Sequence, residues 1–364
     1  MILSSFRAQH FRNIEKCELS FTSGVNLLIG ENAQGKTNVL EGIYLFARGK
    51  SFRGGVEREL TQFGNDGFSL GITFSDGRRE QTLTYSFLGG SRRREKNGAP
   101  VHLGEMLGVF RAVLFYPEHL QIVKGSPEKR RDFLNVAVSG IDPAYIPLYA
   151  KYVKILENRN ALLKQASRGL PVDREELIAW SESLAVAATD IYLRRRAYLL
   201  GFAPHAAEQL RAISGEKETL ALSLESDATG ETEQDALEEY RACFLSHFER
   251  ECAAGCTLFG PHRDDVGIRL SDLDARIYAS QGQQRSIVLA LKLAEGEYAR
   301  EKAGDYPVFL LDDVLSELDA SRRAYLMDAG RDRQLILTSC EEESASGAEN
   351  LIRVSGGNYV SAYR

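Results

Sequence analysis

The residues best suited to chemistry form one short run, Gly30-Glu31-Asn32-Ala33-Gln34-Gly35-Lys36-Thr37, which fits the pattern G-x-x-x-x-G-K-[ST] at every fixed position. An apolar run at 24–29 precedes it as a short buried strand, and residues 38–46 follow it with helical apolar spacing. Strand, glycine loop and helix are the context of a phosphate-binding P-loop, where backbone N–H groups and a helix N-terminus bind phosphate oxygens. We expect Lys36 to reach the β- and γ-phosphates of a nucleotide and Thr37 to bind Mg²⁺. A glycine turn that matches by chance is the alternative.

Two carboxylates follow another apolar run near the end of the chain. Residues 307–311 resemble a parallel strand buried on both faces, and Asp312 and Asp313 come directly after it. Open α/β sheets bind ligands at the C-terminal ends of their strands. We therefore expect Asp312 to bind Mg²⁺, directly or through water, and Asp313 to orient or deprotonate an attacking water. A solvated strand end is the alternative.

A third segment, residues 279–285, comes directly before a helix that carries apolar residues on one face. Ser280 and Gly282 place a hydroxyl and N–H groups at the N-terminus of that helix, which indicates a second anion site. One chain does not need two such sites on one phosphate chain, so a second chain could close its site over the γ-phosphate of the first. A Ser/Gly helix cap without a ligand is an equally good interpretation.

The turn Ser316-Glu317-Leu318-Asp319 follows the paired aspartates. Ser316 and Asp319 have the S-x-x-D spacing of a capping box, which would start a helix here. A contact across a dimer is the other interpretation, and the two are compatible.

These segments require an α/β framework that is interrupted in the middle of the chain. Strand patterns, with a hairpin at 68–88, precede about residue 125, and strands alternate with helices again from residue 257. Between them lie helical patterns, including two stripes joined at Gly169-Leu170-Pro171 as a short helical hairpin. We predict an α/β head with a mixed sheet and flanking helices, formed by residues 1–125 and 257–364. An all-helical lobe, residues 126–256, is inserted into it.

The composition of the 364 residues, 43% hydrophobic and 26% charged, is typical of a soluble globular protein. Because the net charge is −6, nucleic-acid binding would need local basic patches. The runs 92–94, 129–131 and 194–196 are candidates, although a solvated face is the simpler interpretation of each. The five scattered cysteines indicate reduced thiols and no zinc site. Since neither a membrane-spanning run nor a signal peptide is visible, we expect a cytoplasmic protein without membrane contact.

In combination, the P-loop, the S-Q-G-Q-Q run, the strand that ends in two aspartates and the S-E-L-D turn resemble the ABC-type ATPase heads of the SMC family. Further runs narrow the resemblance to the RecF family of bacterial recombination mediators. These runs are G-E-N-A-Q-G-K-T-N, Y-P-E-H-L with K-G-S-P-E-K-R-R, G-P-H-R-D-D, and L-D-D-V-L-S-E-L-D. The resemblance extends from Phe11 to about Leu337, which is nearly the whole chain.

The resemblance implies an ABC-type P-loop ATPase head with a helical second lobe, which uses ATP and Mg²⁺ and is a weak, DNA-stimulated ATPase. ATP binding would drive head-to-head homodimerisation on DNA, and slow hydrolysis would release it. The implied DNA is gapped duplex or a junction of single and double strands. The implied partners are RecO and RecR, with which such proteins load recombinase at gapped DNA and support the SOS response.

The resemblance also implies roles for single residues. Signature contacts fall at Ser280, Gly282 and Gln283, and a cross-dimer contact falls at Asp319. Metal binding falls to Thr37 and Asp312, and catalysis to Lys36 and Asp313. The implied nucleotide contacts are Arg12, Asn13, Gly30, Glu31, Asn32, Ala33, Gln34, Gly35, Lys36 and Thr37.

Two departures from the wider ABC-type pattern affect the expected hydrolysis. Asp313 stands where most members have a glutamate with a longer reach to water. Thr338-Ser339 stands where many members have a histidine that senses the γ-phosphate. Both departures fit a slow enzyme.

Two other functions stay open. One is a P-loop small-molecule kinase, in which the helical region would be a substrate lid. The other is a nucleotide-binding scaffold without turnover. A kinase has no use for Ser280–Gln284, so a change of oligomeric state with ATP would exclude it, and a phosphate-release assay would exclude the scaffold.

Overall fold

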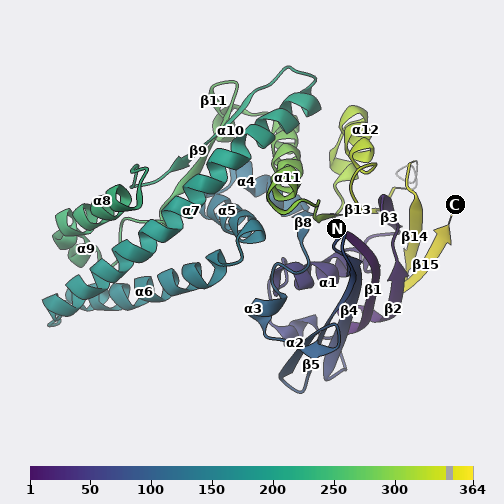
Figure 1. The fold of residues 1–364 in the computed structure, drawn as a ribbon, viewed down its shortest axis with the longest axis horizontal. Helices are drawn as coiled ribbons and strands as arrows, with labels where there is room; N and C mark the ends of the chain where they lie inside the picture. The colour runs from purple at the N-terminus through teal and green to yellow at the C-terminus, as the bar shows by residue number, and fades with distance from the viewer. Residues whose placement is uncertain (342–346, 364) are drawn as a thin grey trace. The chain divides into compact units, whose positions relative to one another are not determined.

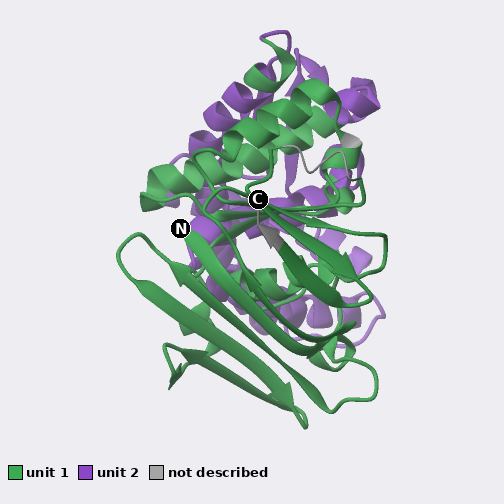
Figure 2. Cartoon of the chain, turned by 90° about the vertical axis from the view of Figure 1, so that its right-hand side faces the viewer, with its two compact units in different colours: residues 1–119, 212–215, 285–364 green, residues 120–211, 216–284 purple. Residues whose placement is uncertain are grey.

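The computed structural model describes residues 1–341 and 347–363 of the chain (Figure 1). The chain divides into two compact units (Figure 2). The first unit consists of residues 1–119, 212–215 and 285–364, and the second consists of residues 120–211 and 216–284. The first unit is therefore assembled from the two ends of the chain.

The first unit contains an antiparallel sheet with the strand order β2-β1-β4-β5-β6-β7. Buried and exposed residues alternate along much of its longer strands, as in a sheet with one face on a core. The predicted hairpin at 68–88 is confirmed as β4 and β5. The strands are β1 (Ile2–Phe11), β2 (Ile14–Ser20), β4 (Gly67–Ser75), β5 (Glu80–Leu88), β6 (Ser91–Lys96) and β7 (Ala99–Pro100).

A second sheet of the first unit has the strand order β15-β14-β3-β13-β12-β8. The strands from β14 to β8 run parallel, and β15 is antiparallel to β14. Every residue of β3, β13, β12 and β8 is buried, which explains why these strands read as continuous apolar runs. The strands are β3 (Val25–Ile29), β8 (Ala112–Phe115), β12 (Val308–Leu311), β13 (Leu335–Ser339), β14 (Asn350–Ser355) and β15 (Asn358–Tyr363).

Helix α1 (Lys36–Arg48) shares one hydrophobic core with both sheets. Its Gly42 stands against the ring of Phe6 in β1, where an added Cβ would come within 2.6 Å of the ring. Gly296 of α11 (Gln281–Ala303) meets Phe309 of β12 in the same way, at 2.1 Å. The other helices of this unit are α2 (Glu57–Leu60), α3 (Leu103–Met106), η2 (Leu315–Glu317) and α12 (Ala320–Ala329), and η1 (Pro117–Leu120) begins in it.

The second unit is mainly helical. Helices α6 (Tyr145–Ala166) and α7 (Arg174–Ser214) form the predicted helical hairpin, and Arg159 of α6 donates a 2.9 Å hydrogen bond to Ser181 of α7 (Figure 1). The other helices are α4 (Gln121–Lys124), α5 (Pro127–Ile141), α8 (Glu233–Ser246), α9 (Phe248–Ala254) and α10 (Ala275–Tyr278).

The expected all-helical lobe contains a strand, so this detail of the prediction is wrong. Strand β9 (Leu220–Glu225) pairs antiparallel with β10 (Asp265–Leu270), which also pairs with β11 (Leu273–Asp274). Leucines at positions 220, 222 and 224 show the alternation of a half-buried strand, but the run is short. Because β10 pairs with β9, residues 257–284 lie in the second unit.

None of the helices in residues 1–341 and 347–363 combines the length and the apolar character that a membrane span needs.

Candidate nucleotide-binding site

The P-loop connects the end of β3 to the start of α1. Gly35 is the N-cap of α1 and has a φ of 113°, a conformation that favours glycine. A Cβ on Gly35 would lie 2.6 Å from the hydroxyl of Tyr359, and a Cβ on Gly30 would lie 2.1 Å from the carbonyl oxygen of Val354. Both fixed glycines of the motif are therefore required by the close approach of neighbouring chain segments.

Lys36 lies over its own loop. Its ammonium donates hydrogen bonds to the carbonyl oxygens of Gly30 at 2.5 Å and Glu31 at 2.8 Å, and the residue is buried. These two hydrogen bonds fix the ammonium group beside the N-terminus of α1. Phosphate oxygens prefer this location because the N–H groups there have no partner within the helix.

Thr37 and Asp312, which are 275 positions apart in the sequence, meet at one edge of the parallel sheet. The Thr37 hydroxyl lies 2.8 Å from Oδ1 and 3.1 Å from Oδ2 of Asp312. The structure brings them together because β3 and β12 run parallel on either side of β13, so their C-terminal ends lie at one edge. Burial raises the pKa of Asp312, while hydrogen bonds from Thr338 and Thr37 act in the opposite direction.

Asp313 occupies a left-handed backbone conformation, with a φ of 51°. Its N–H donates to the hydroxyl of Thr338 at 2.9 Å, and its carbonyl oxygen accepts from the hydroxyl of Ser316 at 2.9 Å. A conformation of this kind is uncommon outside glycine, although aspartate tolerates it better than most residues. The backbone at Asp313 is thus held from both sides.

Thr37 and Asp312 supply a hydroxyl and a carboxylate oxygen, which are hard donors of the type that Mg²⁺ prefers. Mg²⁺ in nucleotide sites commonly takes only one or two protein ligands and fills its remaining positions with water and phosphate oxygens. Within the described parts of the chain, no group of three or more His, Cys, Asp or Glu side chains gathers to hold a metal. The donor set at Thr37 and Asp312 therefore fits a Mg²⁺ ion that is shared with a nucleotide.

The structure also brings Arg12 and Asn13 to the P-loop. Arg12 donates two hydrogen bonds, of 3.0 and 2.6 Å, to Glu41, a fully buried carboxylate of α1. Asn13 donates to the carbonyl oxygen of Ala33 at 3.2 Å and accepts from Asn38 at 2.6 Å. The turn between β1 and β2 is thus fastened to both the loop and its helix.

Sequence reasoning missed Arg53. It donates to Asn38 at 2.9 Å, and its Nε lies 3.7 Å from Glu41. Its positive charge also favours the ionised form of Asp312, against the larger effect of burial. An isolated arginine after a helix carries no motif, so the sequence offered no signal for this position.

The second missed element is the C-terminal hairpin of β14 and β15. The N–H of Gly356, at its turn, donates to the side chain of Gln34 at 2.5 Å. The hydroxyl of Tyr359 in β15 donates to the carbonyl oxygen of Gly35 at 3.4 Å. Gln34 is therefore held by its own chain, and the hairpin supports the outer side of the P-loop.

Ser280, Gly282 and Gln283 lie together at the start of α11, in the second unit. The N–H of Ser280 donates to the Gln283 side chain at 2.8 Å, and the N–H of Gln283 donates to the Ser280 hydroxyl at 3.3 Å. This reciprocal pair is a capping box, so the cap interpretation is confirmed. Gln283 also donates to Glu218 at 2.8 Å. Anion binding by this signature segment, Ser280–Gln284, stays a prediction.

Asp319 caps α12. Its carboxylate accepts from the backbone N–H of Arg322 at 2.9 Å and pairs with the guanidinium of the same residue at 2.5 Å. The predicted capping box between Ser316 and Asp319 is wrong, because Ser316 lies in η2 and bonds to Asp313 instead. Asp319 lies exposed, where a contact with a second chain stays a prediction.

Most of the basic side chains proposed for phosphate contact are engaged within the chain. Arg195 is fully buried and forms an ion pair with Asp264 at 2.7 Å. Arg131 donates to the carbonyl oxygen of Asp264 at 2.9 Å. The other ion pairs are Arg92–Glu57, Arg93–Glu95, Arg130–Asp265, Arg194–Asp142 and Arg196–Glu231. These clusters therefore offer less free positive charge than their sequence indicates.

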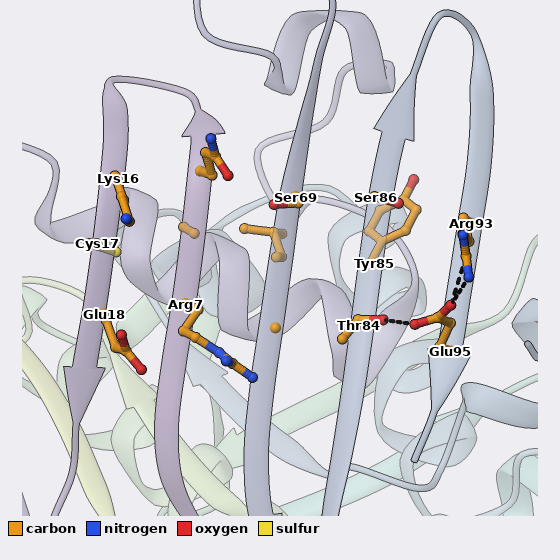
Figure 3. Close-up of a pocket in the computed structure, with 14 residues that line it drawn as sticks. Arg7, Lys16, Cys17, Glu18, Ser69, Thr84, Tyr85, Ser86, Arg93 and Glu95 are labelled. Carbon is orange, nitrogen blue, oxygen red and sulfur yellow. Dashed lines mark hydrogen bonds and ion pairs between the residues drawn. The ribbon is translucent and has the colours of Figure 1, made fainter. Parts of the chain in front are cut away.

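A hollow of about 570 Å³ lies on the antiparallel sheet (Figure 3). Arg7 of β1 points into this hollow. The preceding residue, Phe6, packs on α1, and successive side chains of a strand point to opposite faces of the sheet. The hollow therefore lies on the face of the sheet that points away from α1. Glu95 within it accepts hydrogen bonds from Arg93 at 2.7 Å and Thr84 at 3.2 Å. None of the residues predicted for the nucleotide site lines this hollow.

The chain resembles known proteins over nearly its full length. Residues 2–361 match the family described as RecF/RecN/SMC N terminal domain. A protein of an Exiguobacterium species, named DNA replication and repair protein RecF, is 41% identical over 346 aligned positions, and the match covers 93% of this chain and 92% of that protein. A protein of the same name from Ruminiclostridium cellulolyticum is 35% identical over 368 aligned positions, and the match covers 98% of this chain and 99% of that protein.

Two solved structures show the same architecture. One, described as the recombination mediator protein RecF-ATP in the RecFOR pathway, matches with a TM-score of 0.90 at 33% identity and covers 99% of this chain and 97% of its own. An Smc head bound to the C-winged helix domain of ScpA matches with a TM-score of 0.61 at 15% identity, covering 100% and 98%, and shows the fold alone. The predicted ABC-type α/β head is confirmed.

Proposed function

The chain belongs to the RecF/RecN/SMC N-terminal domain family, and from that premise we propose that it is an ATP-dependent DNA-binding protein of recombinational repair and replication. The observation that carries the proposal is the meeting of Thr37 and Asp312, with Lys36 fixed over the loop beside them. A related solved structure is that of RecF-ATP. This supports ATP as the nucleotide.

The P-loop, Gly30–Thr37, binds the phosphates of ATP through its N–H groups and Lys36, while Arg12 and Asn13 contact the nucleotide from the β1–β2 turn. Thr37 and Asp312 would hold Mg²⁺, which neutralises charge on the phosphates when it is bound. Asp313 then orients the attacking water and accepts its proton, and Lys36 stabilises the charge that develops on the γ-phosphate. The shorter reach of aspartate compared with glutamate fits weak hydrolysis.

ATP binding brings two copies together head to head. In this arrangement Ser280, Gly282 and Gln283 of one copy meet the γ-phosphate held by the other, and Asp319 contacts the partner copy. The exposure of Ser280 and Asp319 supports this role, because neither is covered within its own chain. The first unit acts as the ATPase head and the second as the lobe, so residues 257–284, which the sequence placed in the head, belong to the lobe. Slow hydrolysis opens the dimer and releases the DNA.

The DNA is gapped duplex or a junction of single and double strands in the cytoplasm. The pathway of the related structure, RecFOR, supports RecO and RecR as partners in loading recombinase, with support of the SOS response as a consequence.

Steady-state phosphate release, measured with and without gapped DNA, tests the proposal. We expect slow release that DNA stimulates, and none in a Lys36→Ala variant, because the β/γ-phosphate charge loses its fixed counter-charge. Release no faster than that of the variant would favour a scaffold without turnover. DNA-independent transfer of phosphate to a small molecule would favour a kinase.

A further inference from the structure

Thr338 stands at the centre of the nucleotide edge of the parallel sheet. It lies in β13, between β3, which leads into the P-loop, and β12, which leads into the paired aspartates. Its backbone pairs with Leu28 of β3. Between β12 and β13 the last pair is Leu311 with Leu337, and Asp312 and Thr338 each follow one position later. The side chain is 1% exposed, although threonine carries a polar group. A buried hydroxyl must therefore find its partners inside this site.

Two hydrogen bonds determine the direction of the Thr338 hydroxyl. Its Oγ1 lies 2.9 Å from the N–H of Asp313 and 2.8 Å from Oδ1 of Asp312. A backbone N–H can only donate, so the hydroxyl oxygen accepts from Asp313. The single hydroxyl proton is then available for Asp312. Thr338 thus links the backbone of one aspartate to the carboxylate of the other.

Both aspartates depend on this link for their orientation. Oδ1 of Asp312 lies 2.8 Å from each of two hydroxyls, Thr37 and Thr338, so rotation of the carboxylate would break contacts on both sides. Asp313 is in the left-handed region, which needs compensating contacts from its surroundings. Its N–H bond to Thr338 is such a contact.

We propose that Thr338 is a positioning residue, which holds Asp312 and Asp313 in the one relative orientation that serves metal binding and water activation. This inference rests on the proposed ATPase function. Thr338 is one of the pair Thr338-Ser339 that stands where many ABC-type proteins have a histidine, and its role is exerted through the aspartates and not through contact with the γ-phosphate.

Thr338→Val keeps the shape of the side chain and removes the hydroxyl, and Thr338→Ser keeps the hydroxyl. Outer-sphere partners of this kind typically change activity or metal affinity roughly 10- to 100-fold. We expect Thr338→Val to lower kcat by about that factor, with the affinity for ATP measured without Mg²⁺ unchanged. Thr338→Ser restores the rate. Thr189→Val is the matched control, because Thr189 is also buried and its hydroxyl donates to a helix carbonyl, that of Ala185, at 2.9 Å.

A second readout does not depend on turnover. We expect Mg²⁺ to increase the affinity of the wild-type protein for a fluorescent ATP analogue, and Thr338→Val to lose most of that gain. If the wild-type protein shows no turnover, the proposed ATPase function is wrong. The increase in analogue affinity with Mg²⁺ still tests the role of Thr338. An unchanged gain in Thr338→Val, or a Thr338→Ser variant as impaired as the valine variant, overturns the inference. If Thr338→Val does not fold, Thr338→Ala, which also lacks the hydroxyl, takes its place with the same expectations.

Discussion

Asp312 and Asp313 are neighbours in the chain, yet their surroundings differ. Asp312 is buried, and its carboxylate accepts from the hydroxyls of Thr37 and Thr338. Asp313 is half-buried, and hydrogen bonds with Thr338 and Ser316 fix its backbone. This difference supports the metal role for Asp312 and the water-activating role for Asp313.

Asp313→Asn separates these two roles. We expect the variant to bind ATP normally, because Thr37 and Asp312 still hold Mg²⁺, and to hydrolyse it roughly 10²- to 10⁴-fold more slowly, the usual contribution of a general base. The nucleotide-bound dimer should then accumulate. Single-turnover hydrolysis and an ATP titration on the same preparation measure both effects.

The matched control for that prediction is Asp328→Asn, since Asp328 is exposed on α12 and forms an ion pair with Arg331 at 3.0 Å, away from the P-loop. It should hydrolyse ATP like wild type. Wild-type turnover in Asp313→Asn itself would show that another group activates the water.

The residues that sequence reasoning placed correctly are those whose partners follow from a local pattern. Lys36 and Thr37 follow a strand and a glycine loop, and Asp312 ends an apolar run. The elements that carry these residues, and the edge of the sheet at which they lie, could therefore be predicted. Arg53 and Tyr359 reach the same region only because the chain folds back to it. No spacing in the sequence encodes that approach.

At the scale of elements, the start of α11 has the helix cap that the sequence left as one of two alternatives, and anion binding stays a prediction. The capping box of Ser280 and Gln283 fixes the first turn. Ser280 nevertheless stays exposed, so a cap does not exclude an anion from a second chain.

Ser280→Arg tests the role of that helix in a second chain. We expect nearly unchanged ATP binding by the single chain, with ATP-dependent dimerisation and most hydrolysis lost, because the arginine blocks the approach to the partner's γ-phosphate. Loss of the cap alone would cost only about 1 kcal/mol of stability. Nucleotide titration and light scattering on one preparation measure both effects.

A matched variant for this test is Thr232→Arg, because Thr232 caps α8 in the same way, accepting from the N–H of Asp235 at 3.1 Å. It should lose stability but dimerise with ATP. A dimer of near wild-type affinity in Ser280→Arg would contradict dimerisation through this segment. Weakened ATP binding by the single chain would show that the segment contacts the nucleotide of its own chain.

Strand β9 and Arg159 show why the helical lobe was harder to predict than the head. The alternation in β9 spans only six residues, and its partner β10 lies about forty residues further on. Arg159 interrupts the apolar face of α6, yet it is fully buried, with an ion pair of 2.5 Å to Glu251 and a hydrogen bond of 2.7 Å to Thr257. A buried charge is tolerated only with such partners, which lie far away in sequence.

At the scale of the whole molecule, two partly buried histidines bear on stability in acid. In the second unit, Nδ1 of His262 lies 2.6 Å from the Tyr152 hydroxyl, and Nε2 lies 3.2 Å from the carbonyl oxygen of Thr257. Burial lowers the pKa of His262 to about 4, from an ordinary value of 6.5. Burial also lowers the pKa of His119, in the first unit, well below 6.5.

Because the unfolded chain binds a proton at His262 near pH 6.5 and the folded chain does so only near pH 4, stability is full above pH 6.5 and falls as the pH drops toward 4. This residue contributes up to about 1.4 kcal/mol per pH unit in that window. His262→Asn should flatten the slope of unfolding free energy against pH, measured by urea denaturation between those values. The exposed His102→Asn serves as control, and an unchanged slope in His262→Asn would contradict the assignment.

The central claim is that ATP brings two copies of this chain together, and the molar mass in solution tests it most directly. Light scattering on the wild-type protein and on Asp313→Asn should give 40.5 kDa without nucleotide and with ADP. With ATP and Mg²⁺, the mass of Asp313→Asn should rise to twice that value and stay there, while wild type returns to the monomer as ATP is consumed. A mass that is the same with and without ATP, whether monomer or dimer, would contradict the account.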